Sequence, residues 1–259
     1  MKRVLLTGAS GRLGTVLSAG LPSADRQLVR TDRLAKAPLE GLGEVLDCDL
    51  TDLNRTTDLL TGADVVVHCA GIPDEATFDV LRDSNVTATY NVFEAARVAG
   101  VKRVIYASSA HVVGLYLPGK QLDPNSPPAP DSVYAATKLF GESVGSVYAT
   151  KHSITVVNVR IGSFRPRPEN SRQLSTWLSP RDAVQLFNRA IRAETTGVVT
   201  VYGVSANSRS WWPTDGADRI GYSPEDSADD YDGLVPVDPD SLMWQGGIFA
   251  RTDYAGGAG

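Results

Sequence analysis

Strand-like and helix-like segments alternate along the first 160 residues. The strand-like segments are short and rich in apolar and β-branched residues, at 4–6, 27–31, 44–49, 65–69, 103–107 and 154–160. Longer segments between them have helical character, at 13–20, 54–60, 77–100 and 133–151. Continuous apolar runs such as 65–69 are typical of strands buried on both faces of a parallel sheet. The alternation predicts an α/β fold with a doubly wound parallel sheet and a ligand crevice at the carboxyl ends of its strands.

The pattern changes after residue 160. Pro166 and Pro168 interrupt a loop, and a helix at 181–193 and a last strand at 198–202 are predicted beyond it. Residues 222–240 contain seven Asp and Glu and no Lys or Arg, which indicates an extended, solvated segment. Residues 255–259 are expected to be frayed. We predict a single domain over 1–259, with a core at 1–160 and a small C-terminal lobe at 161–259 that covers the crevice.

Composition narrows the class of protein. With 259 residues, 42% of them hydrophobic and 21% charged, the chain is long enough to bury a substantial core. A net charge of −5 argues against nucleic acid as a partner. No run approaches the roughly 18 apolar residues of a membrane span. Only three apolar residues lie between Arg3 and Thr7, too few for the core of a signal peptide, so we expect a cytoplasmic protein without a membrane partner.

Cysteine and histidine give no sign of a disulfide or a metal site. Cys48 and Cys69 lie near the ends of predicted strands, where a reducing compartment keeps them as small core residues. His68, His111 and His152 show no metal-ligand spacing. No metal is predicted.

A glycine-rich turn, Thr-Gly-Ala-Ser-Gly-Arg-Leu-Gly at 7–14, follows the first predicted strand and opens a helix. Gly8 permits a sharp turn, Gly11 leaves no Cβ between backbone and ligand, and Gly14 lets the helix pack on the strand. The free N–H groups at the helix start then face a pyrophosphate. Asp32, at the end of the second predicted strand, is placed to bind ribose hydroxyls. This context predicts a dinucleotide cofactor, with NAD favoured over NADP.

Tyr134 and Lys138 are four residues apart on one face of a predicted helix. A fixed positive charge stabilises a phenolate and lowers the pKa of a tyrosine, so the pair is a candidate acid–base unit. Tyr116 and Lys120 have the same spacing, but Pro118 and Gly119 between them rule out a helix there. Ser109, at the end of the fifth predicted strand, offers a hydroxyl that could bond the same substrate oxygen.

These motifs together resemble the extended short-chain dehydrogenase/reductase family. The resemblance rests on the glycine turn, Asp32, the helix with Asn85 and Val86, Ser109, and the Tyr134/Lys138 pair, and it covers residues 1 to about 160. It implies a Rossmann-type fold. Matches farther along the chain are similar to bacterial uronate dehydrogenases in particular, at 160–163, 170–177, 205–207, 211–212 and 245–247.

The resemblance implies NAD-dependent oxidation of the anomeric hydroxyl of a hexuronic acid, such as glucuronate or galacturonate, to the aldarolactone. Tyr134 would be the base, Lys138 would lower its pKa and bind ribose, and Ser109 would position the hydroxyl. Ser163 and Arg172 would hold the sugar and its carboxylate, and we expect a homo-oligomer. The candidate cofactor-binding residues are Gly8, Ser10, Gly11, Arg12, Leu13, Gly14, Asp32, Arg33, Asp49, Leu50, Ala70, Gly71, Asn85, Tyr134, Lys138 and Ile161.

Three of the implied residues also have ordinary structural interpretations. Arg172 taken alone would more often be a surface arginine, because nothing local in the sequence buries it. Asn85 either holds backbone or water in the active site or is a tolerated surface residue of a helix. His111 either reaches the substrate or caps the end of a strand.

The chain departs from the uronate dehydrogenase pattern at two positions. Ala110 stands where those enzymes usually have Asn, and Pro73 stands where Ser is common. Both changes would remove hydrogen-bonding groups from the substrate side, which leaves the sugar undecided. A nucleotide-sugar epimerase or dehydratase shares the Ser, Tyr and Lys but needs a larger lobe than the about 100 residues after Arg160. A redox-sensing regulator without turnover has no need of the three residues together.

Overall fold

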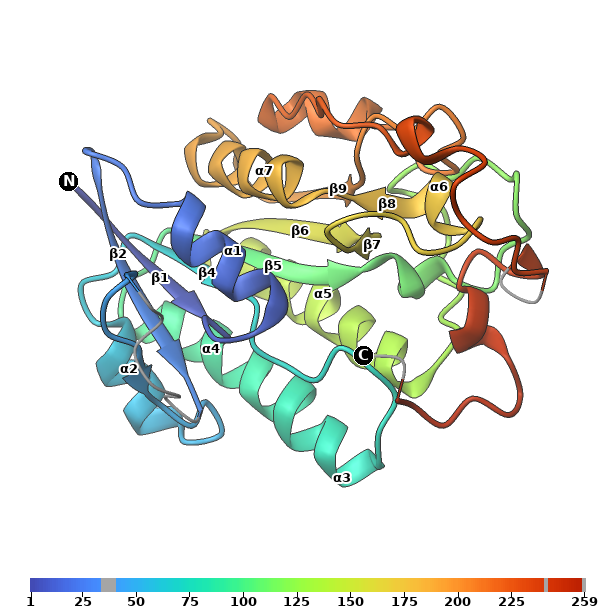
Figure 1. Cartoon of the computed structure of the whole chain (residues 1–259). Coiled ribbons are helices and arrows are strands. Elements are labelled where there is room, and N and C mark those ends of the chain that lie inside the picture. Colours follow the sequence, from blue (N-terminus) through green and yellow to red (C-terminus); the bar gives the residue numbers. More distant parts are fainter. Residues whose placement is uncertain (34–40, 240–241, 258–259) are drawn as a thin grey trace.

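A parallel sheet of seven strands lies at the centre of the described residues, which are 1–33, 41–239 and 242–257 of a computed structural model (Figure 1). The strand order is β3-β2-β1-β4-β5-β6-β9, so the chain reverses its direction of travel across the sheet between β1 and β4. The strands are β1 (Lys2–Thr7), β2 (Arg26–Asp32), β3 (Leu46–Asp47), β4 (Val65–His68), β5 (Arg103–Ser109), β6 (Thr155–Ile161) and β9 (Val198–Gly203). This confirms the predicted doubly wound sheet, whose ligand crevice lies at such a reversal.

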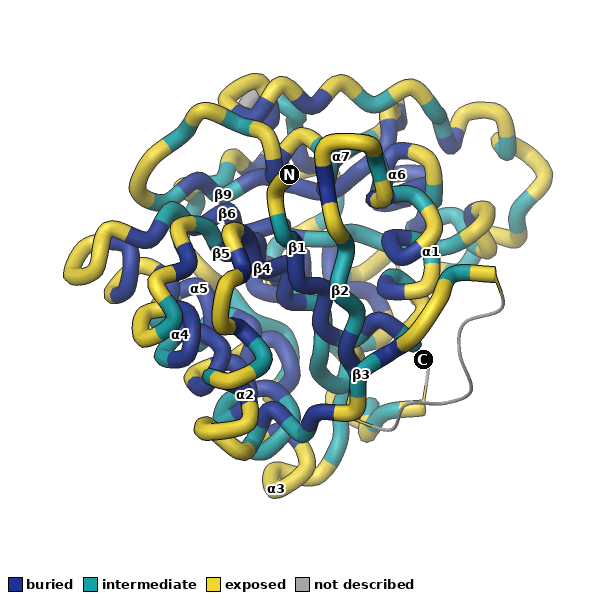
Figure 2. The backbone as a smooth tube through the Cα atoms, turned by 90° about the vertical axis from the view of Figure 1, so that its left-hand side faces the viewer, coloured by how far each residue is buried: buried dark blue, intermediate teal, exposed yellow. Residues whose placement is uncertain are grey.

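Helices cover both faces of the sheet (Figure 1). One face carries α1 (Arg12–Gly20) and α7 (Pro180–Arg192), and the other carries α2 (Leu53–Leu60), α4 (Ala88–Val98) and α5 (Val133–His152). Successive residues of a strand point to opposite faces, so Val4 and Leu6 join the core under α1 and α7 while Leu5 joins the core under α4. Figure 2 shows that the central strands are almost entirely buried. No helix in the described part of the chain is long and apolar enough to cross a membrane.

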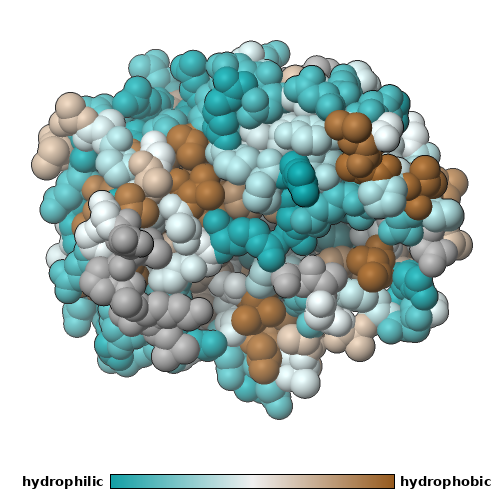
Figure 3. Space-filling model, in the orientation of Figure 1, coloured by the Kyte–Doolittle hydropathy of each residue, from teal (hydrophilic) through white to brown (hydrophobic). Residues whose placement is uncertain are grey.

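Short elements gather at the carboxyl ends of the strands. They include a 3₁₀ turn at Ala110–Val113 after β5, and β7 (Ser163–Phe164), α6 (Gln173–Thr176) and β8 (Trp177–Leu178) after β6. Further 3₁₀ turns follow β9, at Asp215–Ile220, Ala228–Tyr231 and Gly247–Ala250. The surface seen in Figure 3 is mainly hydrophilic, with hydrophobic side chains in separate patches.

The helix predicted at 77–100 is not one regular α-helix. It consists of α3 (Phe78–Leu81), a π-helical segment (Arg82–Thr87) and α4, and Gly100 follows with a positive φ of 74°. A π-helical turn holds more residues than an α-helical one and is frequent at functional sites. Asn85 lies in this segment, and its side-chain amide contacts Ile72 in the loop after β4.

The segment at 222–240, predicted to be extended and solvated, is exposed or half-buried and outside helices and strands over most of its described length, with a few exceptions. Tyr222 and Ala228 are buried, and the segment contains a 3₁₀ turn. Its acidic side chains have partners nearby: Asp226 accepts hydrogen bonds from Ser179 and Arg181. Charge spacing along the sequence carries no information on such distant partners. Asp240 lies outside the described residues.

The chain end is also more ordered than expected. The Gly257 N–H donates to the Asp74 carboxylate at 2.9 Å, and a Cβ on Gly256 would lie 2.3 Å from the Glu75 carbonyl oxygen. Residues 255–257 therefore pack on the loop after β4, and the prediction of fraying was wrong there. Residues 258–259 lie outside the described part of the chain.

Candidate active site

A continuous cleft crosses the carboxyl ends of the strands. Two adjoining cavities of about 300 and 610 Å³ form it, and Gly8, Gly11, Cys69 and Gly71 belong to the walls of both. The candidate cofactor residues in the smaller cavity are Gly8, Ser10, Gly11, Asp32, Arg33, Asp49, Leu50, Ala70 and Gly71. The larger cavity adds Arg12, Leu13, Gly14, Tyr134, Lys138, Ile161 and the candidate substrate residues Ser109, His111, Ser163 and Arg172. Asn85 lines neither cavity.

The glycine turn brings backbone segments closer together than side chains would permit. A Cβ on Gly14 would lie 1.9 Å from the Gly8 carbonyl oxygen, and a Cβ on Gly8, whose φ is +69°, would lie 2.7 Å from the Ala70 nitrogen. Helix α1 begins after Gly11, and because glycine has no side chain, no cap side chain occupies the first N–H groups of the helix. Those N–H groups at the wall of the cleft suit a pyrophosphate.

The smaller cavity suits the adenosine half of a dinucleotide. The Asp32 carboxylate accepts hydrogen bonds from the backbone N–H groups of Ser10 at 2.9 Å and Arg33 at 2.8 Å. These bonds fix the carboxylate and leave lone pairs for ribose hydroxyls. The Ser10 Oγ is buried and has no hydrogen-bond partner within the described residues, which fits a polar ligand group beside it. The residues present therefore fit NAD.

Asn85 holds the loop after β4 against the helix that carries Tyr134. Its Oδ1 accepts from the Ile72 N–H at 2.8 Å, and its Nδ2 donates to the Ile72 carbonyl and the Thr137 Oγ1, both at 3.0 Å. A Cβ on Gly71 would lie 2.9 Å from the Asn85 Oδ1 and 3.6 Å from the Lys138 Nζ. Asn85 is thus buried and bonds the backbone of the loop after β4, which was one of the two interpretations of its sequence position. A direct contact with the cofactor stays a prediction.

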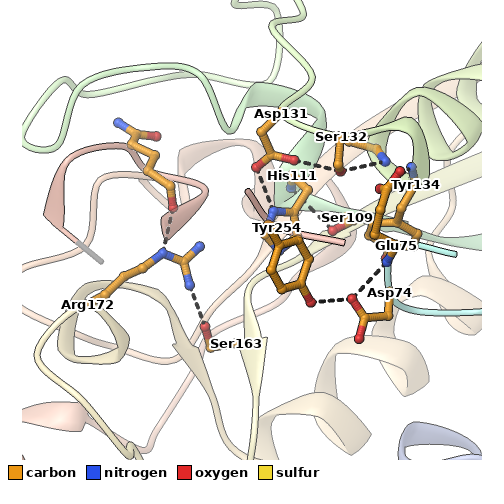
Figure 4. A network of polar contacts seen from close by, with 12 residues as sticks. Asp74, Glu75, Ser109, His111, Asp131, Ser132, Tyr134, Ser163, Arg172 and Tyr254 are labelled. Carbon is orange, nitrogen blue, oxygen red and sulfur yellow. Dashed lines mark hydrogen bonds and ion pairs between the residues drawn. The ribbon is translucent and has the colours of Figure 1, made fainter. Parts of the chain in front are cut away.

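Tyr134 lies in the first turn of α5 and is held from two sides. The Ser132 Oγ caps the helix by accepting from the Ala135 N–H at 3.1 Å. The Tyr134 N–H donates to the Glu75 Oε2 at 3.0 Å. Figure 4 shows Tyr134 next to Ser109 and Glu75. Helix α5 is therefore fixed at its first turn by a side chain from the loop after β4.

Burial shifts the pKa values of Tyr134 and Lys138 in opposite directions. Burial raises the pKa of Tyr134 to about 12, against the effect of its hydrogen bond with Ser109. Burial also lowers the pKa of Lys138 to about 8, and its Nζ donates to the Ala107 carbonyl oxygen at 3.0 Å. Burial thus disfavours the Tyr134 phenolate more strongly than the surroundings favour it, and the lowering of this pKa by Lys138 stays a prediction.

His111 forms a hydrogen-bonded pair with Asp131. Its Nδ1 lies 2.7 Å from an Asp131 Oδ2 that is completely buried. The imidazole ring is 6.0 Å from the Tyr134 ring and 4.0 Å from the Phe249 ring, centroid to centroid. His111 also lines the larger cavity. His111 is therefore one wall residue of the larger cavity, next to Tyr134, and its contact with a substrate stays a prediction.

Arg172 is half-buried in the larger cavity, not on the open surface. Its Nε donates to the Gln245 carbonyl oxygen at 2.7 Å and its Nη1 to the Ser163 Oγ at 3.2 Å (Figure 4). Burial lowers its pKa to about 10, and the charge of Asp131 acts in the opposite direction. Within the described residues the guanidinium has no ion pair, and its Nη2 has no hydrogen-bond acceptor. A charged donor group is therefore available to a ligand.

The C-terminal segment closes one side of the larger cavity. Phe249 lies in its wall, and the Tyr254 ring is 4.7 Å from the Phe249 ring. The Tyr254 hydroxyl donates to the Asp74 carboxylate on the loop after β4, as Figure 4 shows. This contact joins residues 180 positions apart in the sequence.

Sequence reasoning gave no role to several residues of this site. They are Asp74, Glu75, Asp131, Gln245, Phe249 and Tyr254. Asp131 directly precedes Ser132, the cap of helix α5, and could have been noticed for that reason. Gln245 lies in the match at 245–247, but that match gave it no role. The others come from loops and the chain end, which carry no periodic signal.

The remaining histidine and cysteine side chains near the cleft are structural. His68 is buried between the Thr7 Oγ1 at 2.8 Å and the Thr89 Oγ1 at 3.1 Å, and burial lowers its pKa to about 3. Cys69 lines the cleft, but burial raises its pKa to about 12, so its thiol stays protonated. No group of three His, Cys, Asp or Glu side chains suited to a metal ion occurs in the described part of the chain.

Comparisons with known proteins agree with this geometry. The chain is 40% identical over 255 residues to a uronate dehydrogenase of Pseudomonas putida, covering 96% of this chain and 95% of that protein. It is 37% identical over 256 residues to the uronate dehydrogenase of Agrobacterium fabrum, covering 96% and 97%. A solved structure of a mutant uronate dehydrogenase from Agrobacterium tumefaciens, complexed with NAD, is 36% identical with a TM-score of 0.91 and covers 96% and 97%.

The family model for the NAD dependent epimerase/dehydratase family matches residues 4–211. That range includes the glycine turn, Asp32, Ser109, Tyr134 and Lys138, and it ends within the lobe. The family model and the identities over nearly the whole chain lead to one conclusion: this protein belongs to the NAD dependent epimerase/dehydratase family.

Proposed function

We propose that this protein oxidises a hexuronic acid with NAD, removing hydride from the anomeric carbon to give the aldarolactone. The observation that carries this proposal is Arg172, a half-buried cation in the larger cavity without a carboxylate partner in the described residues. A planar guanidinium is matched by a carboxylate, and a partly desolvated pair of this type is strong and directional. Uronic acids carry that carboxylate on the carbon farthest from the anomeric centre.

NAD would lie across both cavities. Its pyrophosphate would be bound at the N-terminus of α1, and its adenosine ribose would be bound by Asp32 in the smaller cavity. When bound, the nicotinamide ring accepts the hydride. The Lys138 Nζ, 3.0 Å from the Ala107 carbonyl oxygen, would bind the second ribose.

Tyr134 would take the proton of the anomeric hydroxyl, and Ser109 would orient that hydroxyl by a hydrogen bond. Removal of this proton lets the electron pair of the C–H bond leave as hydride while the carbonyl of the lactone forms. Because burial raises the Tyr134 pKa to about 12, the phenolate needs the charges that surround it in the complete complex. His111 lies on the same side and would accept from a sugar hydroxyl.

Steady-state kinetics test the proposal. Glucuronate, galacturonate, glucose and galactose would each be assayed with NAD and with NADP. We expect turnover of at least one uronate with NAD, and a KM for the corresponding neutral hexose at least about tenfold higher, since the neutral sugar lacks the bond to Arg172. Turnover of neutral hexoses with no preference for the acids would contradict the proposal.

We also infer that the chain forms a homo-oligomer. Large apolar side chains are exposed on the helices of one face, among them Phe78 on α3, Tyr90 and Val98 on α4, and Val147 on α5. Exposed apolar side chains of this size on one face of the molecule would be buried in a contact between two copies of the chain. Light scattering coupled to size-exclusion chromatography measures the mass, and a monomer of 27.6 kDa would contradict this.

The free thiols of Cys48 and Cys69 favour the reducing cytoplasm as the place of action.

A further inference from the structure

We propose that the buried turn Gln245–Gly246–Gly247 positions Arg172 for the sugar carboxylate and so sets the preference for acidic sugars. The inference rests on the proposed function, in which Arg172 binds that carboxylate. The turn lies 73 residues from Arg172 in the sequence and touches no reacting atom. Its three residues would therefore be positioning residues, and they would act on substrate affinity through the arginine.

Gln245 fastens the turn to the body of the protein. Its side chain is completely buried, and every polar atom of the amide has a partner. The Oε1 accepts from the Trp212 Nε1 at 2.7 Å, and the Nε2 donates to the carbonyl oxygens of Leu117 at 3.2 Å and Lys120 at 2.7 Å. The Gln245 N–H donates to the Tyr116 carbonyl at 2.8 Å. A buried and fully bonded amide is rigid, so the position of its own carbonyl group is fixed.

That carbonyl oxygen accepts the Arg172 Nε–H at 2.7 Å. The Ser163 Oγ accepts from Nη1 at 3.2 Å, and this hydroxyl is itself 2.8 Å from the Thr176 Oγ1. Two of the three nitrogen atoms are therefore bonded to the protein, while Nη2 is bonded to no acceptor in the described residues. An arginine held by Nε and Nη1 has lost most of its rotamer freedom before the ligand arrives, which lowers the entropic cost of binding.

Gly247 provides the space for the arginine side chain. Its φ is +62°, and a Cβ at this position would lie 2.6 Å from the Arg172 Cδ and 2.8 Å from its Nε. The atoms in the way belong to a flexible side chain. A methyl group here would therefore displace the guanidinium, with the backbone of the cleft left in place.

Gly246 has the same relationship to a second site residue. A Cβ there would lie 1.9 Å from the Asp131 Oδ2, the atom that bonds His111. The Gly246 N–H donates to the Gly114 carbonyl at 2.8 Å, which continues the attachment of the turn. The two glycines therefore let one turn pack against both Arg172 and the His111–Asp131 pair.

Gly247→Ala tests the proposal, with Gly221→Ala as the matched control. Gly221 has a similar φ of +70°, but a Cβ there would have no heavy atom within 4 Å. Both variants place an alanine at a similar positive φ, and only the one at position 247 would reach Arg172. Arg172→Ala is the third variant. The measurements are kcat and KM for the preferred uronate, KM for NAD, and a crystal structure of the Gly247 variant.

We expect Gly247→Ala to raise the uronate KM by about 10- to 150-fold, as Arg172→Ala does, with kcat at saturation and the KM for NAD within about twofold of wild type. Gly221→Ala should leave all three constants unchanged. The crystal structure should show the Arg172 Nε moved away from the Gln245 carbonyl. Where Gly247→Ala does not fold, Gly247→Asn with Gly221→Asn replaces the pair, because Asn adopts positive φ more readily.

The outcomes separate this inference from the proposed function. An unchanged uronate KM in Arg172→Ala would refute the carboxylate contact and with it the proposed function. A raised KM in Arg172→Ala together with wild-type constants in Gly247→Ala would refute only the positioning role. A Gly247 variant that loses kcat and NAD affinity as well would show general damage to the cleft, and this would also overturn the inference.

Discussion

The backbone N–H of Tyr134 donates to the carboxylate of Glu75 across 3.0 Å, which joins helix α5 to the loop after β4. The two residues are 59 positions apart in the sequence. An acidic side chain at a helix N-terminus satisfies a free N–H group and opposes the helix dipole. The position of the proposed base is thus fixed by a side chain of the loop after β4.

Tyr134→Phe should lower kcat by at least about 10²-fold, because it removes the proton-accepting oxygen and keeps the ring. NAD affinity, measured by fluorescence titration, should be unchanged. Tyr116→Phe is the matched control, since Tyr116 has the same spacing to a lysine but its hydroxyl bonds the Pro127 carbonyl oxygen. Loss of activity in the Tyr116 variant only would mean that the wrong tyrosine was assigned.

The pH profile of kcat/KM should rise from neutral into alkaline solution. Tyr134 must lose its proton to act as a base, and burial raises its pKa to about 12, so the phenolate fraction increases about tenfold per pH unit below that value. Arg172, with a pKa lowered to about 10, keeps its charge over most of this range. Assays between pH 6 and about 7.5 at constant ionic strength measure the slope below the Lys138 pKa of about 8, and a flat or falling profile in this range would contradict the assignment.

NAD should be preferred over NADP because the Asp32 carboxylate would repel a 2′-phosphate. Asp32→Ala should lower kcat/KM for NAD by about 10- to 150-fold, the effect of one charge-assisted bond, and should narrow the ratio between the cofactors. The ratio of kcat/KM values at fixed uronate concentration is the measurement. Wild-type protein that used NADP as efficiently as NAD would refute this role of Asp32.

Ala110→Asn should reduce stability and give no gain in uronate turnover. The sequence suggested that an amide at this position faces the sugar, but Ala110 is buried in an apolar cluster with Val112, Leu122 and Trp212 and does not line the larger cavity. An amide without partners there costs about 1–3 kcal/mol. Urea unfolding and uronate kinetics of the variant are the measurements. A higher kcat/KM for the uronate at unchanged stability would show that an amide at position 110 does face the sugar.

Stability should fall in acid because of His68. Burial lowers the pKa of His68 to about 3 from its ordinary 6.5, so between these values the unfolded chain binds a proton that the folded chain does not. The free energy of unfolding then falls by up to about 1.4 kcal/mol for each pH unit below 6.5 and is constant above it as far as His68 is concerned. Urea unfolding of wild type and His68→Gln from pH 7 to 5 measures this slope. An equal slope in both proteins would show that other groups cause it.

The sequence by itself determined the sheet, the cofactor class and the principal chemistry. Continuous apolar strands, the glycines at 8, 11 and 14, and the four-residue spacing of Tyr134 and Lys138 are local patterns, and each has a local physical cause. They predict the strand ends, a pyrophosphate site and an acid–base pair before any tertiary contact is known. Arg172 was found only through resemblance, because its surroundings in the sequence do not reveal its burial.

The tertiary structure alone decided which groups surround those patterns. Glu75, Asp131 and the turn at Gln245–Gly247 reach the site from loops that lie 20 to 73 positions away from their partners in the sequence. The paths of such loops follow from packing and not from periodicity. The effect of burial on the Tyr134 pKa could not be predicted from the sequence for the same reason. Desolvation of the phenol depends on every atom packed around it, and those atoms come together only when the chain has folded.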